Sequence, residues 1–189
     1  YRDRTVDFFN QHIEAAVQLD CDHMVVSTGF AYLDVDAEDA FGWCAEAMGR
    51  IARKAEQEGV TLAVEPFTKY TTHICNEASQ LRRLLRTVNN PRLMGLADTD
   101  VIATTAVDTF STFLDVIGPE NLGHVHFVDG NPGGHLVPGD GVLDLDGALE
   151  KLKAIHYTGA LGLEVLDRRY VFAPEAAMKQ AMDWYKERI

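Results

Sequence analysis

Four short apolar segments of this chain each carry one side chain that can bind a metal ion. These side chains are Glu65, Asp98, His126 and Glu164, and successive ones are 33, 28 and 38 residues apart. A charged group among Leu, Val, Ala and Gly residues costs free energy unless it is paired or bound to a cation. Three carboxylates and one imidazole, without a thiolate, suit Mn²⁺, Mg²⁺ or Co²⁺ better than structural zinc. The four residues therefore predict a site for a divalent cation.

Each of these residues is expected on a separate strand of a parallel sheet. Short apolar runs rich in β-branched residues alternate with longer runs of helical periodicity, which is typical of βα units. The expected strands span 23–28, 60–67, 92–99, 123–129 and 159–166. In a parallel barrel the carboxyl ends of all strands meet at one mouth, where active sites lie. The four side chains are expected to converge at that mouth.

Apolar residues at steps of three and four predict six helices. The stripes lie within 6–17, 41–55, 81–88, 107–117, 145–155 and 177–185. Gly59 is an expected helix end, Asn76 and Asp144 are expected N-caps, and Pro174 is expected to begin the last helix.

One α/β domain is expected over residues 1–189, because no segment rich in Pro, Gly or Ser divides the chain. A complete (β/α)8 TIM barrel has eight strands and about 250 residues. Five strands and six helices therefore indicate either the C-terminal portion of a TIM barrel without its N-terminal βα units, or an open doubly wound sheet. Convergence of the four side chains favours the barrel. The start at Tyr1 rather than Met agrees with a loss of upstream residues.

The composition excludes several classes of protein. Of the 189 residues, 47% are hydrophobic and 24% are charged, as in ordinary globular proteins. A net charge of -12 leaves no broad cationic surface for nucleic acid, so a small molecule is the expected partner. No apolar run reaches the roughly 20 residues of a membrane span. The widely spaced Cys21, Cys44 and Cys75 are expected as free thiols of a cytoplasmic protein.

Each candidate ligand has another explanation when it is considered alone. Glu65 or Glu164 could pair with a basic residue of a neighbouring loop. Asp98 could cap the turn that follows it. His124 and His126 point to the same side of a strand, and either could be a hydrogen-bonded core histidine. Only the joint pattern favours the metal site.

Several motifs point to a known family when their order and spacing are considered together. The most specific is Val137-Pro138-Gly139-Asp140-Gly141, a short distance after the His-x-His strand. The others are Glu65–Tyr70 with Cys75-Asn76, Pro91–Leu93, Gly95–Asp98, His124–Asp129, His135–Gly141 and Leu163–Val165. From about Thr5 to Ile189 the chain resembles the sugar isomerases and epimerases with a xylose isomerase-like barrel, especially fructoselysine 3-epimerase and the D-psicose/D-tagatose 3-epimerases.

This resemblance implies a TIM barrel whose first three βα units are absent here. It implies that Glu65, Asp98, His126 and Glu164 bind a divalent metal, commonly Mn²⁺, with Mg²⁺, Co²⁺ or Zn²⁺ as alternatives. A homo-oligomer is also implied. The implied activity is that of an isomerase of carbohydrate metabolism, a ketose 3-epimerase.

Epimerisation at C3 removes a proton next to a carbonyl, forms an enediolate, and returns a proton to the opposite face. A bound cation would stabilise the enediolate as a Lewis acid. Glu65 and Glu164, on opposite sides of the sugar, are the candidates for base and acid. His73, Asn76 and His135 are expected on loops at the same end and are candidates for contacts with sugar hydroxyls.

Three positions depart from the pattern of the ketohexose 3-epimerases. Val101 stands where they have a His, and Thr71 where they have an acidic residue. His135 is assigned to the place of an Arg that contacts substrate in those enzymes. The departures leave the identity of the sugar open and keep the four metal ligands in place.

Three other functions remain open. An aldose–ketose isomerase would use the same ligands to move a proton between C1 and C2. A metal-dependent phosphodiesterase resembling endonuclease IV would need more histidines and a cationic DNA surface, against the charge of -12. A non-catalytic sugar-binding barrel would have no use for the paired Glu65 and Glu164.

Overall fold

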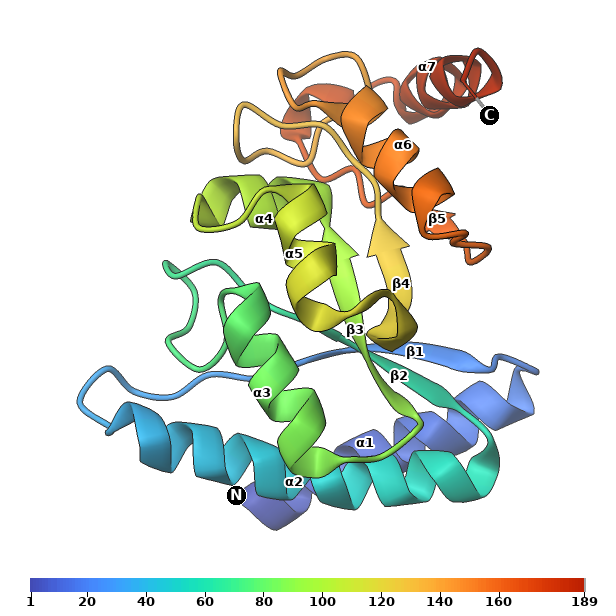
Figure 1. Cartoon of the computed structure of the whole chain (residues 1–189). Coiled ribbons are helices and arrows are strands. Elements are labelled where there is room, and N and C mark those ends of the chain that lie inside the picture. The colour runs from blue at the N-terminus through green and yellow to red at the C-terminus, as the bar shows by residue number, and fades with distance from the viewer. Residues whose placement is uncertain (189) are drawn as a thin grey trace.

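The structure is a computed structural model that describes residues 1–188. Its centre is a five-stranded sheet in the order β1-β2-β3-β4-β5, with every neighbouring pair parallel (Figure 1). The strands are β1 (His23–Ser27), β2 (Thr61–Glu65), β3 (Leu93–Asp98), β4 (Leu122–His126) and β5 (Leu161–Gly162). Strands that neighbour one another in both chain and sheet, joined by helical connections, are the arrangement of a TIM barrel. The five predicted strands are confirmed.

Helices lie between successive strands, and α1 runs beside α2 while α3 runs beside α5 (Figure 1). They are α1 (Arg2–Gln18), α2 (Ala37–Glu58), α3 (Ala78–Val88), α4 (Thr99–Thr105), α5 (Phe110–Ile117), α6 (Leu145–Ala154) and α7 (Pro174–Lys186). The prediction of six helices was wrong by one, within residues 1–188. The additional helix, α4, begins directly after β3 and has only seven residues, and its buried positions include Thr99, Asp100 and Thr105, so it shows no apolar stripe.

Capping residues fix most of the helix boundaries. Gly59 ends α2 with a φ of 78°, a left-handed conformation that glycine adopts without strain. Asp144 caps α6 by accepting a hydrogen bond from the Gly147 amide, and Pro174 begins α7. The prediction of Asn76 as an N-cap was wrong. The α3 N-cap is Glu77, and the Asn76 side chain instead donates to carbonyl oxygens of its own loop.

The core lies between the sheet and the helices that cover it. Strand β2 is buried along its whole length, and Leu62, Leu81 and Leu114 are completely buried. Strand β5 is the weakest part of the sheet, because only Leu161 and Gly162 pair with β4, whereas a strand over 159–166 was predicted. Within the described sheet, β4 is the only neighbour of β5, so ladder hydrogen bonds reach it from one side.

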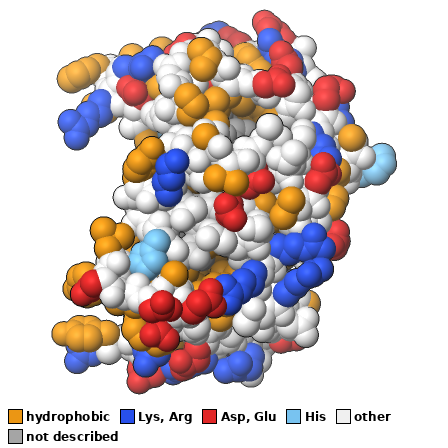
Figure 2. Space-filling view, turned by 60° about the vertical axis from the view of Figure 1, so that its left-hand side comes forward, with side chains coloured by type: hydrophobic (Ala, Val, Ile, Leu, Met, Phe, Trp, Pro, Cys, Tyr) orange, Lys and Arg blue, Asp and Glu red, His pale blue; other side chains and the backbone are white. Residues whose placement is uncertain are grey.

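Acidic and basic side chains are interspersed on the face shown in Figure 2, and apolar side chains project from its left-hand edge. Among residues 1–188, no helix combines the length and apolarity needed to cross a membrane. All three cysteines are free; Cys44 and Cys75 are buried and Cys21 is exposed.

Candidate metal centre

The register of the sheet turns the four candidate ligands to one side. Asp98 pairs directly with His126 across β3 and β4. His126 pairs in turn with Gly162, so Glu164, two residues further along an extended chain, projects to the same side. Val64 pairs with Gly95, which places Glu65 beside Leu96, two residues before Asp98. The period of two along each strand therefore explains how residues far apart in the sequence meet.

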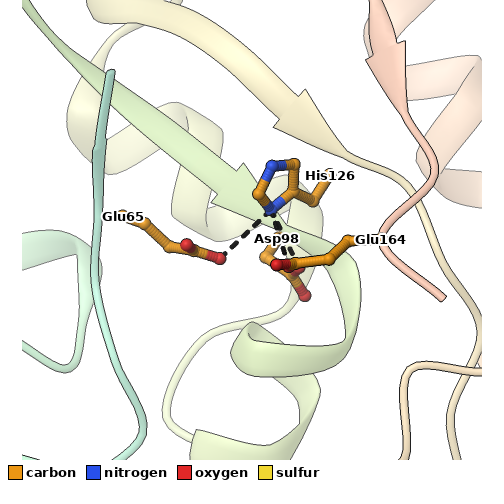
Figure 3. Close-up of side chains that lie close together, drawn as sticks. All are labelled: Glu65, Asp98, His126 and Glu164. Carbon is orange, nitrogen blue, oxygen red and sulfur yellow. Dashed lines mark hydrogen bonds and ion pairs between the residues drawn. The ribbon is translucent and has the colours of Figure 1, made fainter. Parts of the chain in front are cut away.

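The four side chains form one compact cluster. His126 Nδ1 lies 3.1 Å from Glu164 Oε2, 3.2 Å from Glu65 Oε1 and 3.5 Å from Asp98 Oδ2. One ligand atom from each residue lies within 4.8 Å of the others. Glu65 and Glu164 approach from opposite sides, with Asp98 and His126 between them (Figure 3). Three members are buried and Glu164 is half-buried, so the cluster opens to solvent on the Glu164 side.

Asp98 uses its two carboxylate oxygens for different tasks. Its Oδ1 accepts hydrogen bonds from the Asp100 and Val101 amides, each at 2.8 Å, and so caps α4. Its Oδ2 is buried without a hydrogen-bond donor and faces His126. A buried carboxylate oxygen without a donor is costly, and a cation at this point would satisfy it. Asp98 thus caps α4 with one carboxylate oxygen and leaves the other available to a cation.

The pKa shifts in the cluster also indicate that positive charge is stabilised there. Burial lowers the pKa of His126, but the carboxylates of Asp98, Glu164 and Glu65 outweigh burial and raise that pKa to about 11. Burial raises the pKa of Asp98, but His126 and His135 outweigh it and lower that pKa to about 2. For Glu65 burial dominates, and its pKa is raised. Protons on imidazole rings thus compensate these carboxylates, and a divalent cation fits the same place.

His135 is brought to this cluster, whereas within residues 1–188 no hydrogen bond or ion pair joins His73 or Asn76 to it. His135 Nε2 lies 3.4 Å from Asp98 Oδ2 and 3.6 Å from Glu164 Oε2. His73 lies in the loop after β2, and both of its ring nitrogens are buried without a hydrogen-bond partner among residues 1–188. Asn76 Nδ2 donates to the carbonyl oxygens of Phe67 and Thr72, which closes that loop.

Two buried aspartates that shape the site were missed in the sequence. Asp100 holds the loop that carries His135, through the Gly133 and His135 amides. Asp129 accepts four backbone amides from the following loop, those of Gly130, Gly139, Gly141 and Leu143. Apart from Gly130, their partners are backbone amides 10 to 35 residues away, which leave no residue pattern. The glycines of 130–141 were the only available sign that the backbone packs closely here.

Comparison with known proteins agrees with this architecture. A family model described as xylose isomerase-like TIM barrel matches residues 1–188. The chain belongs to the xylose isomerase-like TIM barrel family. The predicted fold, a TIM barrel of which five strands are present, is therefore confirmed, and the alternative of an open doubly wound sheet is wrong.

Relatives in this family carry the names of sugar epimerases, which are isomerases. A fructoselysine 3-epimerase of Shigella flexneri is 25% identical over 187 residues, which are 98% of this chain and 67% of the relative. A ketose 3-epimerase of Arthrobacter globiformis is 30% identical over 118 residues, 62% of this chain and 39% of the relative. The predicted resemblance to 3-epimerases is confirmed by these matches.

Solved structures of the family superpose closely. The apo form of 3-keto-D-glucoside 4-epimerase from E. coli gives a TM-score of 0.85 at 19% identity, over 96% of this chain and 70% of that one. D-psicose 3-epimerase from Clostridium cellulolyticum H10 with D-tagatose gives 0.85 at 18% identity, over 99% and 71%. The IOLI protein with a bound zinc atom gives 0.81 at 19% identity, over 94% and 66%. At these identities the superposition shows the fold.

Proposed function

We propose that this chain is a metal-dependent epimerase that inverts C3 of a ketose or ketose derivative. The observation that carries the proposal is the four-residue cluster, in which two glutamates face each other across an aspartate and a histidine. The names of the family relatives support the reaction class, since they include fructoselysine and ketose 3-epimerases. The proposed partner is a small sugar.

Glu65, Asp98, His126 and Glu164 are the proposed ligands of a divalent cation. Three carboxylates and one imidazole are a donor set for Mn²⁺, Mg²⁺ or Co²⁺, and the zinc atom in the IOLI protein supports a divalent ion in such a barrel. When bound, the cation would supply Lewis-acid stabilisation of the negative charge that develops on the sugar oxygens. Mn²⁺ is our first choice for the assay.

Glu65 and Glu164 are the proposed acid and base. Their opposite positions match a reaction that removes a proton from one face of C3 and returns one to the other, through an enediolate. One of the two carboxyls must hold a proton while the other is ionised, and we assign Glu65 as the acid in one direction. Glu164 then takes the C3 proton as the base. In the reverse reaction the two roles are exchanged.

The proposed sugar contacts are His135, His73 and Asn76. His135 Nε2 lies beside Glu164, where a hydroxyl near C3 would be held. The buried ring nitrogens of His73 lack partners among the described residues, and a substrate oxygen that reached them would satisfy them. The amide nitrogen of Asn76 is used within its loop, which leaves its carbonyl oxygen for a sugar hydroxyl.

The test is solvent isotope exchange in ²H₂O. The protein is loaded with Mn²⁺ and incubated with D-fructose, D-psicose, D-tagatose and fructoselysine, and the products are followed by NMR. We expect deuterium at C3 together with the C3 epimer, and no exchange after treatment with EDTA. Deuterium at C1 or C2 with an aldose product would establish the isomerase alternative instead. Absence of exchange with all four sugars would contradict both enzymatic assignments.

A further inference from the structure

Asp100 is a buried carboxylate for which the proposed reaction has no direct use. Its side chain is 1% exposed, and both of its oxygens are engaged by the loop after β4. Oδ1 accepts the Gly133 amide at 2.5 Å, and Oδ2 accepts the His135 amide at 3.0 Å. Oδ2 also lies 2.9 Å from His135 Nδ1. One carboxylate thus fixes both the backbone and the ring of His135.

These contacts determine which nitrogen of His135 faces the metal centre. A carboxylate beside Nδ1 favours a proton on that atom and sets the plane of the ring. Nε2 is then directed toward Asp98 Oδ2 at 3.4 Å and Glu164 Oε2 at 3.6 Å. His135 itself has a φ of 48°, a left-handed backbone conformation that residues with a side chain adopt uncommonly.

The loop has the backbone required to surround Asp100. Gly133 and Gly134 have φ values of 94° and 106°, which residues with a side chain rarely adopt. A Cβ atom at Gly130 would overlap Asp100 Oδ1. On its far side the loop is joined to the segment that carries Glu164, since the Leu166 amide donates to the His135 carbonyl oxygen at 3.1 Å. Asp100 is therefore linked through His135 to the chain that bears a proposed proton-transfer residue.

We propose that Asp100 is a positioning residue of the epimerase site, which holds His135 beside Glu164 and so orients the sugar. The inference rests on the proposed function. It assigns no chemical step to Asp100, whose carboxylate contacts His135 and the loop rather than the sugar. Because Asp100 lies in α4, the position of this helix would then contribute to substrate recognition.

A double-mutant cycle tests whether Asp100 acts through His135. We expect Asp100→Asn and His135→Ala each to lower kcat/KM about 10- to 100-fold with Mn²⁺ present, and the double variant to be no worse than His135→Ala alone. Asp129→Asn is the matched control, because Asp129 is also buried and holds other backbone amides of the same loop after β4. In the double variant with His135→Ala, the fold reduction in kcat/KM caused by Asp129→Asn should multiply with that caused by His135→Ala. A multiplicative result for Asp100, or unchanged kcat/KM in Asp100→Asn, would overturn the inference.

Amide hydrogen exchange separates this inference from the proposed function. Asp100→Asn should accelerate exchange at Gly133 and His135 at least tenfold and leave Gly139 and Gly141 unchanged, whereas Asp129→Asn should do the reverse. If the wild-type protein turns over none of the sugars, the epimerase proposal fails, and unchanged exchange in Asp100→Asn would still refute the inference about Asp100. If Asp100→Asn does not fold, Gly130→Ala provides a second route, because its Cβ displaces the Asp100 carboxylate. Wild-type kcat/KM and exchange in Gly130→Ala would then refute it.

Discussion

Gly162 lies opposite His126 in the ladder between β4 and β5, and a Cβ atom at Gly162 would lie 3.2 Å from His126 Cδ2. The same atom would lie 3.0 Å from His124 Nε2. Both distances are shorter than ordinary van der Waals contact, so a side chain at this position would require the rings to shift by a few tenths of an ångström. The glycine thus leaves room for the two histidine rings of the candidate metal centre.

Gly162→Ala should therefore weaken metal binding, by roughly tenfold, because His126 must move away from the three carboxylates. Mn²⁺ titration by calorimetry measures the change. Gly42→Ala is the control, since a Cβ at Gly42 in α2 meets nothing within 4 Å. That variant should bind Mn²⁺ as the wild type does and gain about 0.5–1 kcal/mol of stability from helix propensity. Equal affinities in all three proteins would contradict the packing argument.

The two roles of Asp98 can be separated by two substitutions. Asp98→Asn retains an oxygen for the α4 amides but loses the charge, so Mn²⁺ binding should be lost while the cap is kept. Asp98→Ala should lose both and be less stable than Asp98→Asn by about 1 kcal/mol, the usual value of an N-cap. Urea unfolding without metal, together with Mn²⁺ titration, measures both effects. Equal stability of the two variants would show that the cap contributes nothing.

Glu164→Gln should lower turnover by at least about 100-fold while the protein remains folded, because the amide cannot accept the C3 proton. The rate of C3 exchange in ²H₂O is the measurement, and circular dichroism verifies the fold. Glu150→Gln on α6 is a suitable control, since Glu150 is exposed and pairs with Lys153. Turnover that survives in Glu164→Gln would exclude Glu164 as the base.

Metal removal should lower the stability of the protein. Mn²⁺ at 100 times its Kd should raise the free energy of unfolding by about 2.7 kcal/mol over the EDTA-treated protein. His126→Asn should abolish this increase, whereas His156→Asn, at an exposed histidine after α6, should preserve it. Thermal unfolding with and without Mn²⁺ is the measurement. An increase that persists in His126→Asn would place the ion elsewhere.

The stability of the fold should fall in alkaline solution for reasons independent of the metal. Burial raises the pKa of Cys44 and of Tyr157, each to about 12, whereas their unfolded values are about 8.5 and 10. The native state therefore keeps protons that the unfolded state releases, and this stability is present below the unfolded values and lost as the pH rises toward 12. The urea concentration at the midpoint of unfolding should decrease as the pH is raised from about 7 to about 10.5.

A substitution identifies the thiol responsible for part of this decrease. Cys44→Ala should be less stable at neutral pH, because of the cavity, but should lose less stability on going to alkaline pH. Cys21→Ala is the control, because Cys21 is exposed. Iodoacetamide should modify Cys21 in the native protein and reach Cys44 and Cys75 only after unfolding. A midpoint that does not change with pH would show that the buried thiol ionises without unfolding.

Features that leave a residue pattern along the chain could be predicted from the sequence. The strands were predictable because apolar β-branched runs recur once per βα unit. Spacing predicted that Glu65, Asp98, His126 and Glu164 would meet, and the register brings them together. Their roles, the single domain, the oligomer and the cytoplasmic location remain predictions.

Features that depend on tertiary context could not be predicted. Helix α4 has no apolar stripe because it is buried on several sides, and β5 is short because only one strand pairs with it. Asp100 and Asp129 bind amides 10 or more residues away, such as those of Gly133 and Gly139. His135 was predicted from its place on a loop at this end of the sheet and from the family resemblance, and only the structure reveals the carboxylate that holds it.

The direct passage from β3 into α4 limits how this protein can be engineered. Because Asp98 is both the last residue of the strand and the cap of the helix, one inserted residue after it would rotate the helix by about 100°, at 3.6 residues per turn, and remove the Asp100 carboxylate from His135. The loop between β2 and α3 has no comparable constraint, since twelve residues separate Glu65 from Ala78. Insertions or randomised libraries aimed at new sugar specificity therefore belong in that loop, and the strand–helix junction should be left at its present length.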